Sequence, residues 1–197
     1  MTRRPRVLIV DDEPALLDLY EIWLADLDVA IRRANGGAEA LERCHEGIDV
    51  VLLDRHMPHL SGDEVLDELR ERGFDPRVAF VSAATPDVRI VDLDIDAYLT
   101  KPVAREVYVD LVQSLLRRES LPKTTDRYLS NLSKRAALLE TESRSVLRNE
   151  PAYAALEEEL SQLAPRVDGH QLDDPFLRRA STDGGADDGL MPFDPTP

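Results

Sequence analysis

The sequence predicts an α/β fold, a doubly wound five-stranded parallel sheet with helices on both faces. Three observations lead to this fold class. Short apolar runs alternate with segments of helical periodicity through residues 1–118. Several of these runs are apolar at every position, as parallel strands are when both faces of the sheet are covered. Polar side chains directly follow four of the runs, at the strand ends where open α/β sheets hold their chemistry.

The five apolar runs are the expected strands, and we expect them in the order 2-1-3-4-5. The first and third strands are then neighbours at the switch point of the sheet, where such folds bind their ligands. The expected strands cover residues 7–10, 29–31, 50–53, 78–81 and 95–99.

Apolar residues at three- and four-residue steps predict a helix after each strand. Asp12 is placed to cap the first helix, whose first turn contains Pro14, and Gly73 follows the end of the third. The fourth helix is short and weak. The expected helices cover residues 14–25, 38–46, 63–72, 86–93 and 104–117.

Residues 1–118 are therefore expected to form one domain, followed by a linker over residues 119–126. Residues 127–164 predict a helical hairpin, with one continuous helix up to a break at Pro151 and a second helix after it. Both helices are apolar on one face, so they must pack against each other, the first domain or a second chain. Residues 165–197 are rich in Asp, Gly and Pro and are expected to be disordered.

The chain of 197 residues carries a net charge of −15, and no segment of it is basic. This charge counts against a DNA-binding surface of the usual kind. No apolar stretch approaches the ~18 residues of a membrane span and no secretory signal is evident, so we expect a cytoplasmic protein without membrane contact. Cys44 is the single cysteine, which excludes a disulfide framework. Abundant acid with little Lys indicates a halophilic protein.

Three aspartates, Asp11, Asp12 and Asp54, follow the first and third expected strands and should meet at one edge of the sheet. Carboxylates gathered in this way repel each other, so they either raise a pKa or recruit a cation. With no His or Cys on the strand ends, a hard cation that prefers oxygen ligands fits, and Mg²⁺ is the expected cofactor. Mg²⁺ also bridges to phosphate oxygens, which favours phosphoryl transfer over hydrolysis.

Asp54 is the expected nucleophile, because the cation screens the charge of an incoming phosphoryl group. Lys101 brings a positive charge to the same crevice from the fifth strand, and Ser82 offers a hydroxyl from the fourth. Each residue also has a plainer interpretation, as a helix cap, a turn-forming acid or part of a surface loop. Their joint occurrence at the correct ends of separate strands favours the interpretation as a site of phosphoryl transfer. His56 and His59 are either a metal-binding pair or, as we favour, solvated loop side chains.

At these residues the sequence resembles the receiver domain of two-component response regulators. The resemblance spans about residues 5–118 and implies a flavodoxin-like fold in which Asp54 takes phosphate from a histidine kinase. Asp11, Asp12 and Asp54 would hold Mg²⁺ together with the main-chain carbonyl of His56. The matching motifs are Val7-Leu8-Ile9-Val10-Asp11-Asp12-Glu13-Pro14, Asp54-Arg55-His56-Met57-Pro58 with Gly62, Ser82-Ala83, and Tyr98-Leu99-Thr100-Lys101-Pro102.

The resemblance also implies a switch. Lys101, expected before a cis bond to Pro102, would pair with the phosphate, and the Ser82 hydroxyl would move toward it. Tyr98 would then rotate inward into the space that Ser82 leaves. The surface of helix four, strand five and helix five would change as a result, and this 4-5-5 face or the C-terminal helices would carry a possible homodimer.

Residues 127–164 resemble the HalX domain that is attached to receivers in salt-adapted archaea. The acid-rich composition of the chain agrees with this resemblance. The residues that carry it are Tyr128-Leu129, Ser133-Lys134-Arg135-Ala136-Ala137-Leu138-Leu139-Glu140, and Asn149-Glu150 with Tyr153-Ala154-Ala155-Leu156.

Three functions are open to the C-terminal helices. In a transcriptional regulator, Lys134, Arg135, Arg144 and Arg148 would face DNA phosphates, although acidic residues are interspersed with them. The alternative is a phospho-dependent protein-interaction or dimerisation module. An output enzyme ranks last, because no nucleophile–base pair or phosphate loop follows the first domain, so we expect a switch and not an enzyme.

Overall fold

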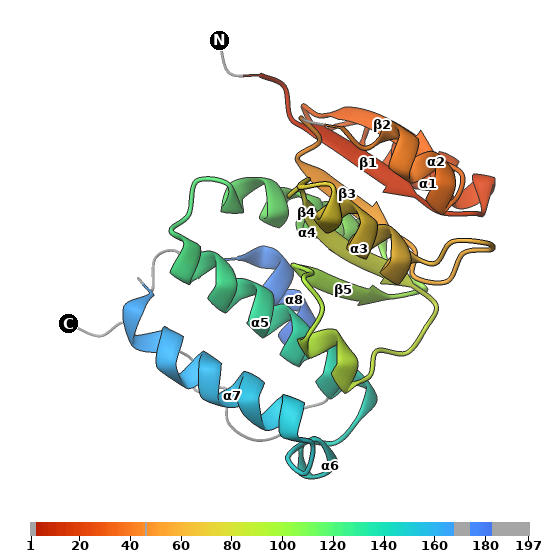
Figure 1. The fold of residues 1–197 in the computed structure, drawn as a ribbon. Coiled ribbons are helices and arrows are strands. Elements are labelled where there is room, and N and C mark those ends of the chain that lie inside the picture. The colour runs from red at the N-terminus through yellow and green to blue at the C-terminus, as the bar shows by residue number, and fades with distance from the viewer. Residues whose placement is uncertain (1–2, 46, 168–173, 183–197) are drawn as a thin grey trace.

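The structure contains the predicted sheet of five parallel strands in the order β2-β1-β3-β4-β5 (Figure 1). It is a computed structural model that describes residues 3–45, 47–167 and 174–182. The strands are β1 (Arg6–Val10), β2 (Ala30–Ala34), β3 (Val50–Leu53), β4 (Arg77–Ser82) and β5 (Ala97–Thr100).

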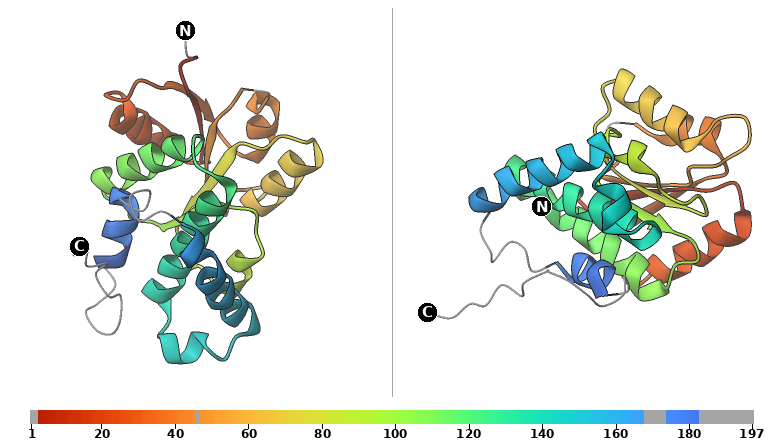
Figure 2. Two further views of the ribbon diagram at one scale, coloured as in Figure 1. Left: turned by 90° about the vertical axis from the view of Figure 1, so that its left-hand side faces the viewer. Right: turned by 90° about the horizontal axis from the view of Figure 1, so that it is seen from below.

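Helices cover both faces of the sheet (Figures 1 and 2). Within the described parts of the chain, no helix has the length and apolarity needed to cross a membrane. The helices are α1 (Pro14–Leu24), α2 (Gly37–Arg43), α3 (Gly62–Glu71), η1 (Val88–Val91), α4 (Arg105–Arg118), α5 (Lys123–Thr141), α6 (Arg144–Leu147), α7 (Pro151–Leu163), η2 (Ala164–Arg166) and α8 (Pro175–Thr182).

Successive strand side chains enter two different hydrophobic cores, as the pleat of a strand requires. Leu8 and Val51 lie in the core that includes side chains of α2 and α3. Val7 and Leu52, their neighbours in sequence, lie in the core that includes side chains of α1 and α4. Because both faces of β1 and β3 are buried, their runs are apolar without alternation, and this is why the sequence predicted them well.

Helix α5 lies beside β5, the edge strand of the sheet (Figure 1). Its Leu129 joins the core of α1 and α4, whereas its Ala137 and Leu138 join the core of α2 and α3. The helix therefore packs across the sheet edge and belongs to both layers. Tyr153 of α7 is buried in the same core as Ala137, so the predicted helical hairpin packs on itself and on the sheet.

The expected helix over residues 86–93 is wrong in type, because only the 3-10 turn η1 forms there. The Asp87 side chain accepts a hydrogen bond from the Arg89 amide at 2.9 Å and begins this turn. Asp92 and Asp94 follow its last residue, where negative side chains oppose the dipole of a longer helix. The start of the segment is therefore favourable for a helical turn, whereas the acidic residues after Val91 disfavour its extension into a longer helix.

Helix α5 differs from the expected helix at both ends. It begins at Lys123, directly after Pro122, so the connection from α4 is shorter than the predicted linker over residues 119–126. It ends at Thr141 instead of continuing toward Pro151, and Glu142 is extended before α6. The Thr141 hydroxyl donates to a carbonyl three residues back, a local bond that competes with helix continuation.

The predicted disorder over residues 165–197 is wrong for residues 174–182, which include α8. Phe176 and Leu177 are buried in the core of α1 and α4. Asp174 accepts hydrogen bonds from the Phe176 amide, at 3.0 Å, and from the Ser114 hydroxyl of α4. Two apolar residues in an acidic segment are enough to dock it on an existing core. Residues 168–173 and 183–197, also covered by that expectation, lie outside the described residues.

Candidate functional site

The predicted site residues lie at the carboxyl edge of the sheet. Asp11 and Asp54 directly follow β1 and β3, and their amides extend the ladder by donating to the carbonyls of Ala34, at 3.2 Å, and Val10, at 2.9 Å. The backbone of each aspartate is therefore fixed by the sheet itself. Asp12, predicted to cap α1, does not occupy the cap position, which belongs to Glu13, so its carboxylate is available to the site.

The three predicted carboxylates do come together. Asp11, Asp12 and Asp54 each offer an oxygen, and these oxygens lie within 4.8 Å of one another. Asp11 is 2% exposed and Asp54 is 7% exposed, whereas Asp12 is half-buried. Two of the three carboxylates are therefore buried, and the third is partly accessible to solvent.

Lys101 supplies the positive charge that the sequence predicted. Its Nζ donates to Asp11 Oδ2 at 2.7 Å and to Asp54 Oδ2 at 2.9 Å. Burial lowers the pKa of Lys101, but its bonds to the two carboxylates outweigh burial and leave that pKa above its usual value. Burial raises the pKa of Asp11, although bonds from Lys101 and the Glu13 amide act in the opposite direction. One lysine therefore does not balance the negative charge of the three carboxylates.

These residues fit a hard divalent cation. The donors are carboxylate oxygens, the ligands that Mg²⁺ prefers, and they already converge. Burial, and to a smaller extent the charge of Asp54, raise the pKa of Asp11, and a bound cation would act in the opposite direction by stabilising the ionised carboxylate. Among the described residues, this is the only cluster of three or more potential metal-ligating side chains, so neither His56 nor His59 joins one.

His56 faces the site with its backbone. Its amide donates to Asp54 Oδ1 at 3.3 Å, so both oxygens of Asp54 have a partner. The use of the His56 carbonyl as a metal ligand stays a prediction. The predicted cis peptide bond between Lys101 and Pro102 is present.

Gly62 explains how α3 approaches the site so closely. A Cβ atom at this position would lie 2.4 Å from the Asp54 carbonyl oxygen and 2.8 Å from the Arg55 Cα. The Gly62 amide donates to the Arg55 carbonyl at 2.8 Å, and the Ser61–Glu64 capping box fixes the first turn. Only glycine lets the start of α3 pack against the backbone of Asp54.

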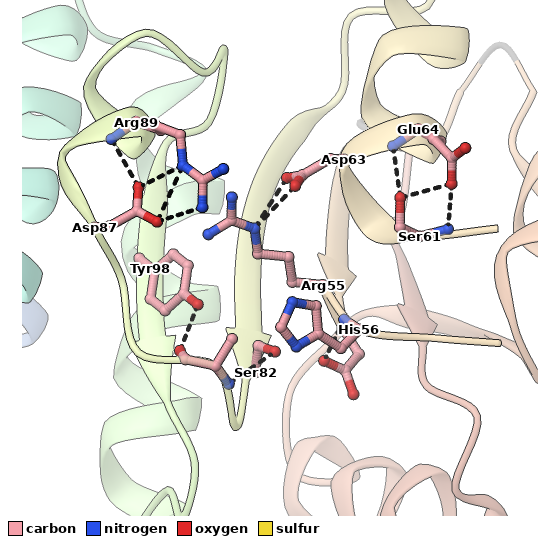
Figure 3. A network of polar contacts seen from close by, with 11 residues as sticks. Arg55, His56, Ser61, Asp63, Glu64, Ser82, Asp87, Arg89 and Tyr98 are labelled. Carbon is pink, nitrogen blue, oxygen red and sulfur yellow. Dashed lines mark hydrogen bonds and ion pairs between the residues drawn. The ribbon is translucent and has the colours of Figure 1, made fainter.

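Ser82 and Tyr98, the two predicted switch residues, lie near each other (Figure 3), and both form a hydrogen bond with the backbone of Ala84. The fully buried Ser82 Oγ accepts a hydrogen bond from the Ala84 amide at 3.3 Å. The Tyr98 hydroxyl donates to the Ala84 carbonyl at 2.6 Å, and its ring, 3% exposed, packs edge-on against Phe80. Tyr98 therefore already points inward in this structure.

Arg55 is the residue that sequence reasoning missed. Its side chain is buried between α3 and the β4–η1 loop, where its Nε donates to both carboxylate oxygens of Asp63 at 3.1 and 3.0 Å (Figure 3). The guanidinium lies 5.9 Å from the centre of the Phe80 ring. Burial raises the pKa of Tyr98, and Arg55 opposes that rise. The sequence signal that could have revealed this role is a basic residue, Arg55, directly after the strand-end Asp54.

An acidic cluster and a lysine at the carboxyl edge of a 2-1-3-4-5 sheet define the class: flavodoxin-like α/β domains with a carboxylate–lysine site. The family model of the response regulator receiver domain matches residues 7–113, more than half of the chain. The chain belongs to the receiver-domain family of two-component response regulators.

Relatives and solved structures agree with this assignment. A Haloferax volcanii protein, provisionally named a transcriptional regulator, is 44% identical over 78% of this chain and 26% of its own length. The transcriptional regulatory protein DltR of Streptococcus agalactiae is 31% identical over 71% of the chain and 64% of its own length. The chain thus spans about a quarter of the first relative and less than two thirds of the second.

Among solved structures, the receiver domain of the Francisella response regulator 1452 is 25% identical, with a TM-score of 0.54 over 59% of this chain and 99% of that one. The response regulator TrrA from Thermotoga maritima, solved in complex with Mg²⁺ and BeF, is 31% identical. Its TM-score is 0.50 over 56% of this chain and 98% of that one. Each likeness thus covers more than half of this chain and nearly the whole of the solved structure.

Proposed function

We propose that the chain is a phosphorylation switch in which Asp54 accepts a phosphoryl group from the phosphohistidine of a histidine kinase. The observation that carries this proposal is the placement of Asp54, almost buried among carboxylates and bonded to Lys101 at 2.9 Å. An Asp54 oxygen forms the new bond to phosphorus as the bond from phosphorus to the kinase imidazole nitrogen breaks. The imidazole keeps the electron pair and takes up a proton.

The neighbouring residues have separate roles in this proposal. Asp11, Asp12, Asp54 and the His56 carbonyl would hold Mg²⁺, which screens the negative charge of the phosphoryl group when bound. Lys101 pairs with a phosphoryl oxygen, since its ammonium already reaches Asp54. That the related TrrA was solved with Mg²⁺ and BeF supports the same metal here.

The output is less closely defined. We divide the chain into a receiver over residues 1–118 and a HalX-like helical module over residues 127–164, and the names of the relatives support a role in transcription. The chain acts as a switch and not as an enzyme on other substrates.

A protein-interaction output is favoured by one specific observation. Of the basic residues expected to face DNA, Arg135 and Arg144 pair with Glu157, and Lys134 is buried against backbone carbonyls. Capture of promoter DNA that weakens with salt would favour direct DNA binding. A change of mass in light scattering on phosphorylation, without DNA capture at any salt concentration, would favour the interaction module.

Phosphoryl uptake tests the proposed acceptor. Wild-type protein is incubated with Mg²⁺ and acetyl phosphate, and intact mass gives the fraction phosphorylated. Asp67→Asn, a change of an exposed aspartate on α3, should behave as wild type, whereas Asp54→Asn should gain no phosphoryl group. Uptake by Asp54→Asn at the wild-type rate would reject Asp54 as the acceptor.

A further inference from the structure

Lys134 of α5 is a buried cation held by backbone carbonyls. It is 6% exposed, and its Nζ donates to the carbonyl of Val91 at 3.0 Å and to that of Leu93 at 2.6 Å. Burial lowers its pKa, although the charges of Asp94 and Asp96 act in the opposite direction. A charge in this environment is stable only with strong hydrogen-bond partners, so the contact is specific.

The carbonyls that Lys134 binds belong to the end of η1. Val91 is the last residue of that turn, and Leu93 follows shortly after it. The last carbonyls of a helix have no partner within the helix and need one from outside. A positive side chain at this end also complements the helix dipole. Lys134 therefore caps η1 from a different element of the fold.

A second contact ties the start of the same segment to α5. The Thr141 hydroxyl, which donates to the Leu138 carbonyl at 3.0 Å, also lies 3.5 Å from the Pro86 carbonyl. Val88 and Val91 also pack on the core that contains Leu138 of α5. Helix α5 thus contacts both ends of the segment that follows β4.

The other attachment of this segment is the candidate phosphoryl site. The Ala84 carbonyl accepts a hydrogen bond from the Tyr98 hydroxyl, and the Ala84 amide donates one to the Ser82 hydroxyl. The chain from Ser82 to Leu93 therefore runs from the site to Lys134 with hydrogen bonds at each end.

We propose that Lys134 is a positioning residue that caps η1 and couples the Asp54 site to α5 through residues 83–94. The inference rests on the proposed phosphorylation of Asp54. A segment fixed at both ends transmits a change at one end to the other, and such coupling is reciprocal. The burial of Lys134 also removes it from any surface that α5 offers to a partner.

The cap itself is tested by hydrogen exchange on the full chain without phosphodonor. The amides of Ile90 and Asp92 bond within η1, to the carbonyls of Asp87 at 3.0 Å and Arg89 at 3.2 Å. Lys134→Met, which removes the donors, should speed their exchange about tenfold. Lys134→Arg keeps donors and should retain most of the protection, and Lys123→Met, an exposed change in the same helix, should match wild type.

The coupling is tested by adding Mg²⁺ and acetyl phosphate, with the phosphorylated fraction read by intact mass. Exchange of the α5 amides should change on phosphorylation in wild type and Lys123→Met, and should not change in Lys134→Met. Unchanged η1 exchange in Lys134→Met, or unchanged α5 exchange in phosphorylated wild type, would overturn the inference. Failure of phosphoryl uptake is seen separately in the mass.

A second variant keeps the test valid if Lys134→Met does not fold. Thr141→Val removes the hydroxyl that reaches Pro86 and leaves Lys134 in place. It should weaken the phosphorylation response of the α5 amides at least threefold. A response equal to that of wild type would contradict a route through residues 83–94.

Discussion

At the scale of single residues, Asp11 is the side chain that would gain most from a bound cation. It is 2% exposed, and burial raises its pKa even though Lys101 bonds to it. When the pKa of a carboxyl group is higher in the folded state than in the unfolded state, the free energy of unfolding falls as the pH rises from the unfolded pKa to the folded pKa. The reason is that the folded state resists ionisation over this range. At neutral pH the ionised Asp11 is therefore a cost to the metal-free fold.

We therefore predict that Asp11→Asn stabilises the metal-free protein. Removal of one buried negative charge should raise the free energy of unfolding by about 1 kcal/mol at neutral pH. The same change should reduce the additional stability that Mg²⁺ gives to wild type. Urea unfolding with and without Mg²⁺ measures both effects, with Asp67→Asn as the matched control. A less stable Asp11→Asn protein, or one with the full gain from Mg²⁺, would show that the buried charge of Asp11 does not act as described.

The strand-end residues were the easiest to predict from sequence. Asp11, Asp54 and Ser82 each follow a buried run, so their position at the sheet edge depends on local pattern alone. Arg55 was not predicted, because its role depends on Asp63 and Phe80, which lie on other elements. Contacts that form only when distant segments meet leave no periodic trace in the sequence.

At the scale of elements, α7 is anchored by one aromatic residue. Tyr153 is fully buried, and its hydroxyl donates to Glu157 Oε1 at 2.7 Å. Burial and then the bond to Glu157 raise the pKa of Tyr153 to about 12. The folded state therefore holds this proton where the unfolded state releases it.

This raised pKa predicts a loss of stability at alkaline pH. Between the usual tyrosine pKa of 10.0 and the raised pKa of about 12, the folded state binds more protons than the unfolded state, so the free energy of unfolding falls as pH rises. Tyr153→Phe removes this contribution, and its stability should fall less steeply over the same window. Chemical unfolding at several pH values measures the two slopes. Equal slopes would mean that Tyr153 ionises equally easily in both states.

Element boundaries were predicted less well than element types. The C-terminal acids of η1 and the extended Glu142 after α5 interrupt patterns that the apolar periodicity alone would continue. Helix α8 was missed because its two buried residues stabilise it through contacts with other elements, α4 and α5 among them. The periodicity of a short segment carries little information when tertiary contacts decide its state.

At the scale of the whole molecule, the C-terminal helices cover much of the receiver face that was expected to form a dimer. Helix α5 packs along β5, and its Lys134 binds η1. Phe176 of α8 lies in the core shared with α4. A homodimer through the 4-5-5 face would have to displace these helices. It therefore stays a prediction only for a state of the protein in which the C-terminal helices have moved off this face.

The packing of α8 makes a stability prediction for the whole chain. Phe176 is 1% exposed, and Phe176→Ala should lower the free energy of unfolding by about 3 kcal/mol. Ile22→Ala changes an apolar side chain that is 66% exposed and should have an effect near zero. Urea denaturation of the full chain compares the two variants. Equal stability would show that residues 174–182 are not part of the folded core.

The proposed switch depends above all on Asp54 as the residue that carries the phosphoryl group. The most direct measurement is to phosphorylate the wild-type chain, trap the acyl phosphate by borohydride reduction and map the modified peptide by mass spectrometry. We expect reduction at Asp54 and at no other aspartate, including Asp11 and Asp12. A stable phosphate on His56 or His59, or modification at a different aspartate, would contradict the assignment.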